Sequence, residues 1–284
     1  MAIVLGLAAA LTYGAADFLG ALATKTTKVF TVVFLSQVLG SGLLLVTLPF
    51  FLDTPLSGAA LGWGALGGVA GAVGVALFYQ GLSVGRMGAI PPITGVEAAA
   101  VPVVFGLISG ERPSVLALGG VVVALGAVAL VSASPKEDVA SAGPARWWVE
   151  PGVGLAIGAG LAFGAFFILL GQAGDDSGLW PLVGARISSL ATIAIALIAT
   201  KGLERPQRSA LPAIAGAGLL DVAANLFFLL AAREGLLSIV AVLTSMYPAT
   251  TVVLARVILD ERFHRTQLTG LGLAAFGVVA MTLG

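Results

Sequence analysis

The sequence predicts an all-α polytopic membrane protein of about ten transmembrane helices, arranged as an inverted repeat of five plus five. Three observations predict this fold: the composition, the recurrence of long apolar runs, and a similarity between the two halves of the chain. Of the 284 residues, 58% are hydrophobic and only 10% are charged, whereas a soluble domain carries about 25% charged residues. A soluble core cannot account for this composition, so we expect much of the chain to face lipid.

The apolar runs are roughly 18 residues or longer, which is enough to cross the ~30 Å hydrocarbon layer of a bilayer. We expect ten spans, near residues 2–23, 29–51, 58–81, 87–109, 115–132, 152–173, 178–200, 210–232, 236–258 and 266–283. The opening run lacks a basic region, so it is expected to be a span rather than a signal peptide. The polar segment 133–150, rich in Ser, Ala and Pro, is predicted to link a five-helix repeat at 1–132 to a second one at 151–284.

The two halves match each other at a constant offset of 150 residues. Thr94 corresponds to Thr244, Gly120 to Gly270, and the Glu-Arg pair at 111–112 to the pair at 261–262. One register that holds along the whole chain indicates an internal duplication. Because each copy has an odd number of spans, the second copy enters the membrane from the opposite side. Inverted repeats are common in transporters, whose substrate site lies between the repeats.

The composition also limits the classes of function. The net charge is zero and gives no indication of nucleic-acid binding, and the chain has no cysteine. The one histidine, His264, lies in a charged hairpin, so neither a metal cluster nor a nucleophile–base pair can be assembled. We therefore expect no enzyme activity, no metal and no cofactor, with a proton as a possible coupling ion. The expected partners are the lipid bilayer and a small-molecule substrate, for a monomer or a homodimer.

The expected location is the bacterial inner membrane. Basic residues are concentrated in the loops opposite the termini: Lys25, Lys28, Arg86, Lys136, Arg146, Lys201, Arg205, Arg208, Arg262 and Arg265. The positive-inside rule then places both termini outside the cytoplasm. Several of these bases have acidic neighbours, which weakens their bearing on orientation.

Asp17 lies within the first apolar run, where an ionisable side chain costs at least ~2.5 kcal/mol and needs a wet cavity, a partner or a proton. Tyr13 lies one turn earlier on the same helical face. In one interpretation Asp17 faces a cavity and alternately binds a proton and a substrate. In the alternative it is structural, paired with Arg186 or reaching Lys25.

Glu97 lies near the centre of the fourth predicted span, between Pro91-Pro92 and Pro102. Prolines disrupt backbone hydrogen bonds, and such irregularity in a membrane is tolerated next to protein or a water-filled cavity. The equivalent of Glu97 in the second half is Tyr247, and Thr94 and Thr244 flank the pair. We interpret these four residues as a polar surface that lines a shared cavity, with a structural hydrogen bond as the alternative for Glu97.

Several other residues are candidates for the same cavity. Tyr79, Gln80, Asp221 and Asn225 could contact substrate or hydrogen-bond neighbouring helices. Arg186 is expected to be a buried counter-charge, and Phe163 and Phe167 to pack or form an apolar wall. Arg256 precedes Asp260 by one turn, and an ion pair within the helix suffices to explain it.

These features resemble the drug/metabolite transporter superfamily, in its EamA-type branch. The resemblance rests on the ten-span repeat and on the "SGERPS" hairpin, which recurs as "LDERFH" in the second half. It covers essentially the whole chain, with one EamA-like unit per half.

The stretch from Asp17 to Lys25 is also similar to the first helix of small multidrug resistance proteins, where an acid is followed by Gly at +3 and Lys at +8. This second resemblance implies that Asp17 is a proton- and cation-binding group. The second half has Phe167 at that position, so the resemblance implies that the chain keeps one carboxylate of a former pair and that the cavity is asymmetric.

Taken together, the sequence favours a secondary transporter that works by alternating access and exports a small organic metabolite or drug-like molecule in exchange for protons. Asp17 and Glu97 would favour cationic or zwitterionic cargo, and Tyr13, Phe163 and Tyr247 offer apolar or cation–π contacts. Burial favours the protonated form of a carboxylate, as proton coupling requires. The alternatives are a proton-independent exchanger or facilitator of the same fold, and a membrane scaffold subunit that transports nothing.

Overall fold

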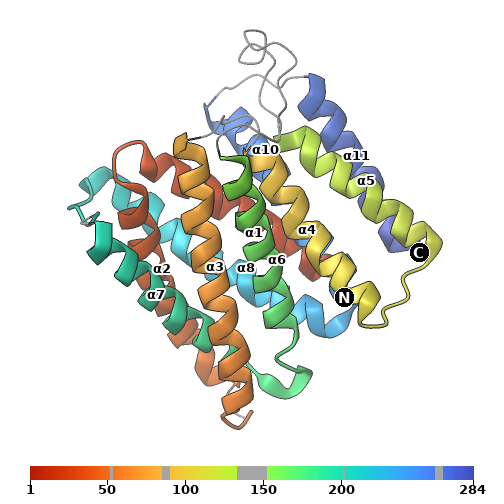
Figure 1. The fold of residues 1–284 in the computed structure, drawn as a ribbon, viewed down its shortest axis with the longest axis horizontal. Helices are drawn as coiled ribbons and strands as arrows, with labels where there is room; N and C mark the ends of the chain where they lie inside the picture. The colour runs from red at the N-terminus through yellow and green to blue at the C-terminus, as the bar shows by residue number, and fades with distance from the viewer. Residues whose placement is uncertain (52–53, 85–89, 133–151, 201, 260–264) are drawn as a thin grey trace.

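The computed structural model describes residues 1–51, 54–84, 90–132, 152–200, 202–259 and 265–284, and the regular structure in these ranges is helical (Figure 1). The helices are α1 (Ala2–Thr24), α2 (Val29–Thr47), α3 (Gly58–Val84), α4 (Ile90–Ile108), α5 (Val115–Ser132), α6 (Val153–Gly171), α7 (Trp180–Thr200), α8 (Leu211–Glu234), α9 (Leu237–Thr244), α10 (Tyr247–Leu259) and α11 (Arg265–Leu283). Short 3-10 turns span Leu48–Phe51, Asp175–Ser177 and Arg208–Ala210.

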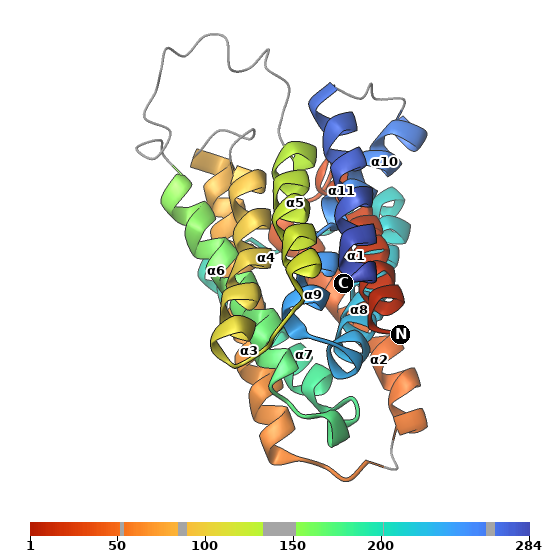
Figure 2. The ribbon, with the colours of Figure 1, turned by 90° about the vertical axis from the view of Figure 1, so that its right-hand side faces the viewer.

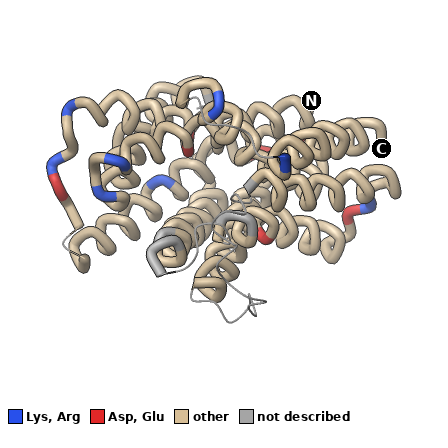
Figure 3. The backbone as a smooth tube through the Cα atoms, turned by 90° about the horizontal axis from the view of Figure 1, so that it is seen from above, with Lys and Arg blue, Asp and Glu red and all other residues tan. Residues whose placement is uncertain are grey.

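Eight helical segments within the described ranges are long and apolar enough to cross a membrane, and two shorter apolar segments, Ile93–Ile108 and Val115–Val131, complete the set of ten. The predicted all-α, multi-pass membrane fold is confirmed. Large apolar side chains cover the outside of the bundle, as shown by the exposed Ile108 and Val115. Figure 3 shows the charged residues as a few short segments, on helices and on the connections between them, along a chain that is otherwise uncharged.

The ninth span differs from the expected continuous helix, because it is broken between α9 and α10. Met246 N–H donates to the Leu243 carbonyl, and Ala249 N–H donates to the Met246 carbonyl. Pro248 has no N–H, so the Thr244 carbonyl loses the donor that a continuous helix would supply. The break, at Ser245 and Met246, therefore lies two to three residues before Pro248, and α9 and α10 are separate helices in one span.

Equivalent helices of the two halves make equivalent contacts. Helix α1 packs against α8 and α10, and its counterpart α6 packs against α3 and α4; in the same way, α2 packs on α8 and α7 packs on α3. Each half therefore packs largely on the other half rather than on itself. Small residues permit these contacts, since a Cβ added to Gly40 or Gly218 would collide with backbone of the facing helix.

The α5–α11 contact is reciprocal. A Cβ on Gly120 would meet Met281, and a Cβ on Gly270 would meet Val131. Met281 lies 150 residues after Val131, and Gly270 lies 150 residues after Gly120, so each contact repeats the other with the halves exchanged. The start of each helix meets the end of its equivalent, and the two helices run antiparallel, side by side (Figure 2).

Candidate functional site

Tyr13 of α1 is the centre of the candidate site and contacts three other helices. Its hydroxyl donates a 2.8 Å hydrogen bond to Asn225 Oδ1 on α8. Its ring centroid lies 6.4 Å from that of Phe167 on α6 and 6.4 Å from that of Tyr247 on α10. The sequence prediction placed these four residues around one cavity, and the structure brings them together.

Asp17 lies one turn beyond Tyr13 on the same face of α1. The spacing of Gly6, Tyr13 and Asp17 puts them on one side of the helix, and Gly6 packs against Leu243 of α9. This face therefore points into the bundle, whereas the exposed Leu11 is on the outer side. Asp17 is nevertheless exposed, and its carboxylate makes no hydrogen bond or ion pair with another described residue. An accessible, unpaired acid thus faces the interior of the bundle.

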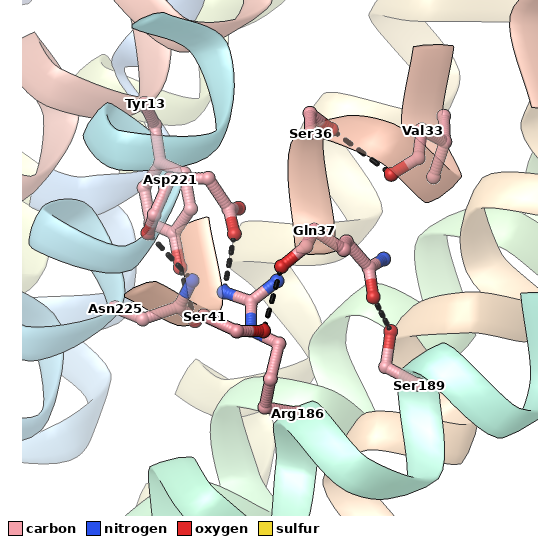
Figure 4. Close-up of polar contacts among 9 residues, drawn as sticks. All are labelled: Tyr13, Val33, Ser36, Gln37, Ser41, Arg186, Ser189, Asp221 and Asn225. Carbon is pink, nitrogen blue, oxygen red and sulfur yellow. Dashed lines mark hydrogen bonds and ion pairs between the residues drawn. The ribbon is translucent and has the colours of Figure 1, made fainter. Parts of the chain in front are cut away.

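An ion pair lies beside Asp17. Arg186 of α7 donates a 2.8 Å hydrogen bond to Asp221 Oδ2 of α8, and Asn225 Nδ2 donates to the Asp221 carbonyl at 2.7 Å (Figure 4). The side chain of Arg186 is 12% exposed and that of Asp221 is 39% exposed. The charge of Asp221 also interacts with that of Asp17. The alternative pairing of Asp17 with Arg186 is not formed. Two carboxylates and one guanidinium leave one net negative charge when all are ionised.

Three members of this polar region, Gln37, Ser41 and Ser189, were not predicted from the sequence. Ser189 Oγ of α7 donates to Gln37 Oε1 of α2 at 2.8 Å, and Ser41 Oγ donates to the Gln37 carbonyl at 2.7 Å (Figure 4). Gln37 is a polar residue within an apolar run, and this feature of the sequence could have indicated the polar region. Asp221 was recognised as a candidate, but nothing in the sequence indicated that its partner is Arg186.

Glu97 lies at the α4–α6 contact, next to Gly160, whose missing side chain leaves room for it. The carboxylate oxygen Oε2 is buried and has no hydrogen-bond partner among the described residues. Thr94, one turn earlier, donates to the Ala156 carbonyl at 3.2 Å. Thr94 and Thr244 are both almost fully buried. The sequence predicted that both line a cavity, but in this conformation neither side chain is accessible.

The remaining aromatic candidates have different surroundings. Phe167 is buried and packs on Phe228 with a centroid distance of 4.6 Å. Phe163 is partly buried and lies 6.5 Å from the ring of Phe78. The backbone of Tyr79 belongs to α3, but its side chain lies outside the described residues, as do Asp260 and His264. Gln80 is exposed.

Polar side chains without hydrogen-bond partners lie at the break between α9 and α10. The hydroxyls of Thr244 and Ser245 are buried and have no hydrogen-bond partner within the described part of the chain. The first turn of α9 is anchored by Glu111, whose two carboxylate oxygens accept hydrogen bonds from the N–H groups of Leu237 and Ser238 at 2.8 and 3.1 Å. The sequence singled out Glu111 as part of a repeated hairpin, without this capping role. Across the described ranges, no cluster of His, Cys, Asp or Glu side chains could hold a metal ion.

Comparison with known proteins agrees with this architecture. The family model described as "EamA-like transporter family" matches residues 1–133 and again residues 150–283. A solved structure titled "Crystal structure of protein" is 17% identical, covers 99% of this chain and 96% of its own, and superposes with a TM-score of 0.77. No curated protein matches the chain significantly. Because the family model accounts for nearly the whole sequence in two copies, the chain belongs to the EamA-like transporter family.

Proposed function

We propose that this membrane transporter exports small cationic or zwitterionic organic molecules in exchange for protons, by alternating access. The observation that carries the proposal is Asp17, an accessible and unpaired acid on the inward face of α1. A carboxylate in such a position can bind either a proton or a cation, and the two then compete for it. That competition couples the uptake of one to the release of the other.

The surroundings of Asp17 support a cationic group in the cargo. The cluster of Asp17, Asp221 and Arg186 carries a net negative charge, and the rings of Tyr13 and Tyr247 lie close together beside it. Aromatic faces attract cations by about 0.5–2 kcal/mol each. Glu97, with its unpartnered oxygen, is a second candidate for proton binding.

The arrangement of the helices supports alternating access. The reciprocal, antiparallel contact of α5 and α11 is what two oppositely inserted repeats related by a twofold axis would make. We propose that residues 1–132 and 151–284 are these repeats. An exchange of conformations between them would open the site first to one side and then to the other.

The test uses proteoliposomes with an entrapped pH-sensitive dye and an imposed pH gradient. Addition of a transported cation from a panel of quaternary amines, amino acids and nucleobases should dissipate the gradient with the wild-type protein and not with Asp17→Asn. Glu204→Gln serves as the control, because this acid pairs with Lys28 outside the membrane spans. Equal dissipation by Asp17→Asn would refute the coupling role of Asp17.

Two other functions give different results in the same vesicles. A proton-independent exchanger or facilitator of this fold would move labelled cargo down its own gradient without proton movement. A scaffold subunit would move none of the panel under any gradient. The accessible acid favours the proton-coupled exporter over both.

A further inference from the structure

A cavity of about 210 Å³ lies between α2, α7 and α8, and every surface that lines it is apolar. It is lined by Leu43, Leu44, Thr47, Leu179, Leu182, Val222, Ala223 and Leu226. Well-packed protein interiors contain few voids larger than a water molecule. An apolar space of this size is therefore suited to a hydrocarbon occupant rather than to water.

Two residues that line the cavity are close along their helices to members of the charged cluster. Leu182 precedes Arg186 by one turn on α7, and Val222 follows Asp221 on α8. One helical turn spans about 5.4 Å, so a molecule of modest length can reach from the acidic cluster into the cavity. The side chains of Leu43, Thr47 and Leu226 are only partly buried, which leaves the cavity open on one side.

We infer that this cavity is a subsite for the hydrocarbon part of the cargo, and that the cargo is a single-chain cationic amphiphile whose cationic head lies at Asp17 and Asp221. The charge is complementary, because the cluster carries one net negative charge and the adjoining cavity offers only apolar surface. Ala223 keeps the space open, since a larger side chain at this position would fill it. The inference rests on the proposed cationic cargo and adds to it a specific place for the apolar part.

The experiment measures binding of alkyltrimethylammonium ions, from tetramethylammonium to the octyl compound, to the purified full-length protein in amphipol. Burial of one methylene group favours binding by up to about fourfold. With the wild-type protein we expect affinity to rise by up to about fourfold per methylene and to level off once the cavity is full.

Ala223→Phe should flatten this dependence on chain length while the affinity for tetramethylammonium stays within about twofold. The control is Val46→Phe on α2, where the side chain is 66% exposed on the outer surface and the dependence should be unchanged. A second variant, Leu226→Ala, enlarges the cavity and should move the levelling-off to longer chains.

Two results would overturn the inference: the same chain-length dependence in Ala223→Phe as in the wild type, or no dependence in the wild type although tetramethylammonium binds. The latter is also expected if a bilayer lipid tail fills the cavity. If no compound of the series binds, the cationic cargo itself is wrong, and this inference fails with it.

Discussion

The guanidinium of Arg186 and the carboxylate of Asp221 form a 2.8 Å ion pair between α7 and α8, within the membrane-spanning part of the bundle. The pair neutralises two charges that would each be costly in hydrocarbon. It also leaves Asp17, the neighbouring acid, as the unpaired charge of the cluster within the described part of the chain. Because Arg186 pairs with Asp221, Asp17 is the acid that stays free to bind a proton or a cation.

Removing one partner of the ion pair should destabilise the protein more than removing both. Arg186→Met or Asp221→Leu leaves an unpaired charge, and we expect each to lower the free energy of unfolding by about 1.5–3 kcal/mol. The double variant removes both charges and should recover most of that loss. Melting temperatures of the four proteins in detergent give the comparison, and a double variant as unstable as the two losses summed would contradict it.

Tyr13→Phe should destabilise the protein by about 1–3 kcal/mol, because Asn225 Oδ1 loses its donor in a largely buried setting. The matched control is Thr12→Val. The Thr12 hydroxyl bonds only to carbonyls of its own helix, so this change should be nearly neutral. Thermal unfolding of both variants provides the measurement, and equal melting temperatures would exclude a structural role for the Tyr13 hydroxyl.

Glu111→Ala should expose the unsatisfied first turn of α9 and lower the free energy of unfolding by about 0.5–2 kcal/mol, as loss of a helix N-cap does. Arg112→Ala is the control, since among the described residues its guanidinium donates only to the Glu111 backbone carbonyl, at an exposed position. Hydrogen exchange at Leu237 and Ser238 would report the cap directly. Exchange rates that stay at the wild-type value in Glu111→Ala would argue against it.

Gly40→Ala should destabilise the α2–α8 contact, because the added Cβ would collide with the Gly218 carbonyl. Overpacking of this kind costs about 1–3 kcal/mol. Gly42→Ala lies two residues away on α2, in open space, and should be neutral or stabilising by up to about 1 kcal/mol. The melting temperature of Gly40→Ala should therefore fall while that of Gly42→Ala stays the same or rises, and equal decreases in both variants would be inconsistent with the close approach.

The spans were predictable from sequence because each must bury some twenty residues in hydrocarbon, and length and apolarity alone define them. The break in the ninth span was not. Pro102 lies inside the continuous helix α4, whereas Pro248 follows the break, and both occur in apolar runs. The difference depends on packing: α9 is buried along its length, whereas no residue of α10 is fully buried.

The candidate site was predictable in part. The spacing of Tyr13 and Asp17 puts them on one helical face whatever the tertiary structure. The partner of Arg186 depends on how α7 and α8 are placed relative to each other, which the sequence of either helix leaves open. The burial of Thr94 and Thr244 likewise depends on neighbouring helices.

The packing of α1 on α8, and of α3 on α6 and α7, has a consequence for how the protein is made. The proposed five-helix repeat is not a unit of folding, because the main contacts of its helices are with helices of the other half. During synthesis α1 enters the bilayer long before the ribosome has translated α8. Until α8 is present, the inward face of α1, with Gly14 and Asp17, is in contact with lipid or with a chaperone. The acid that the finished transporter keeps accessible is thus also a group that is costly to hold in lipid before the bundle has assembled.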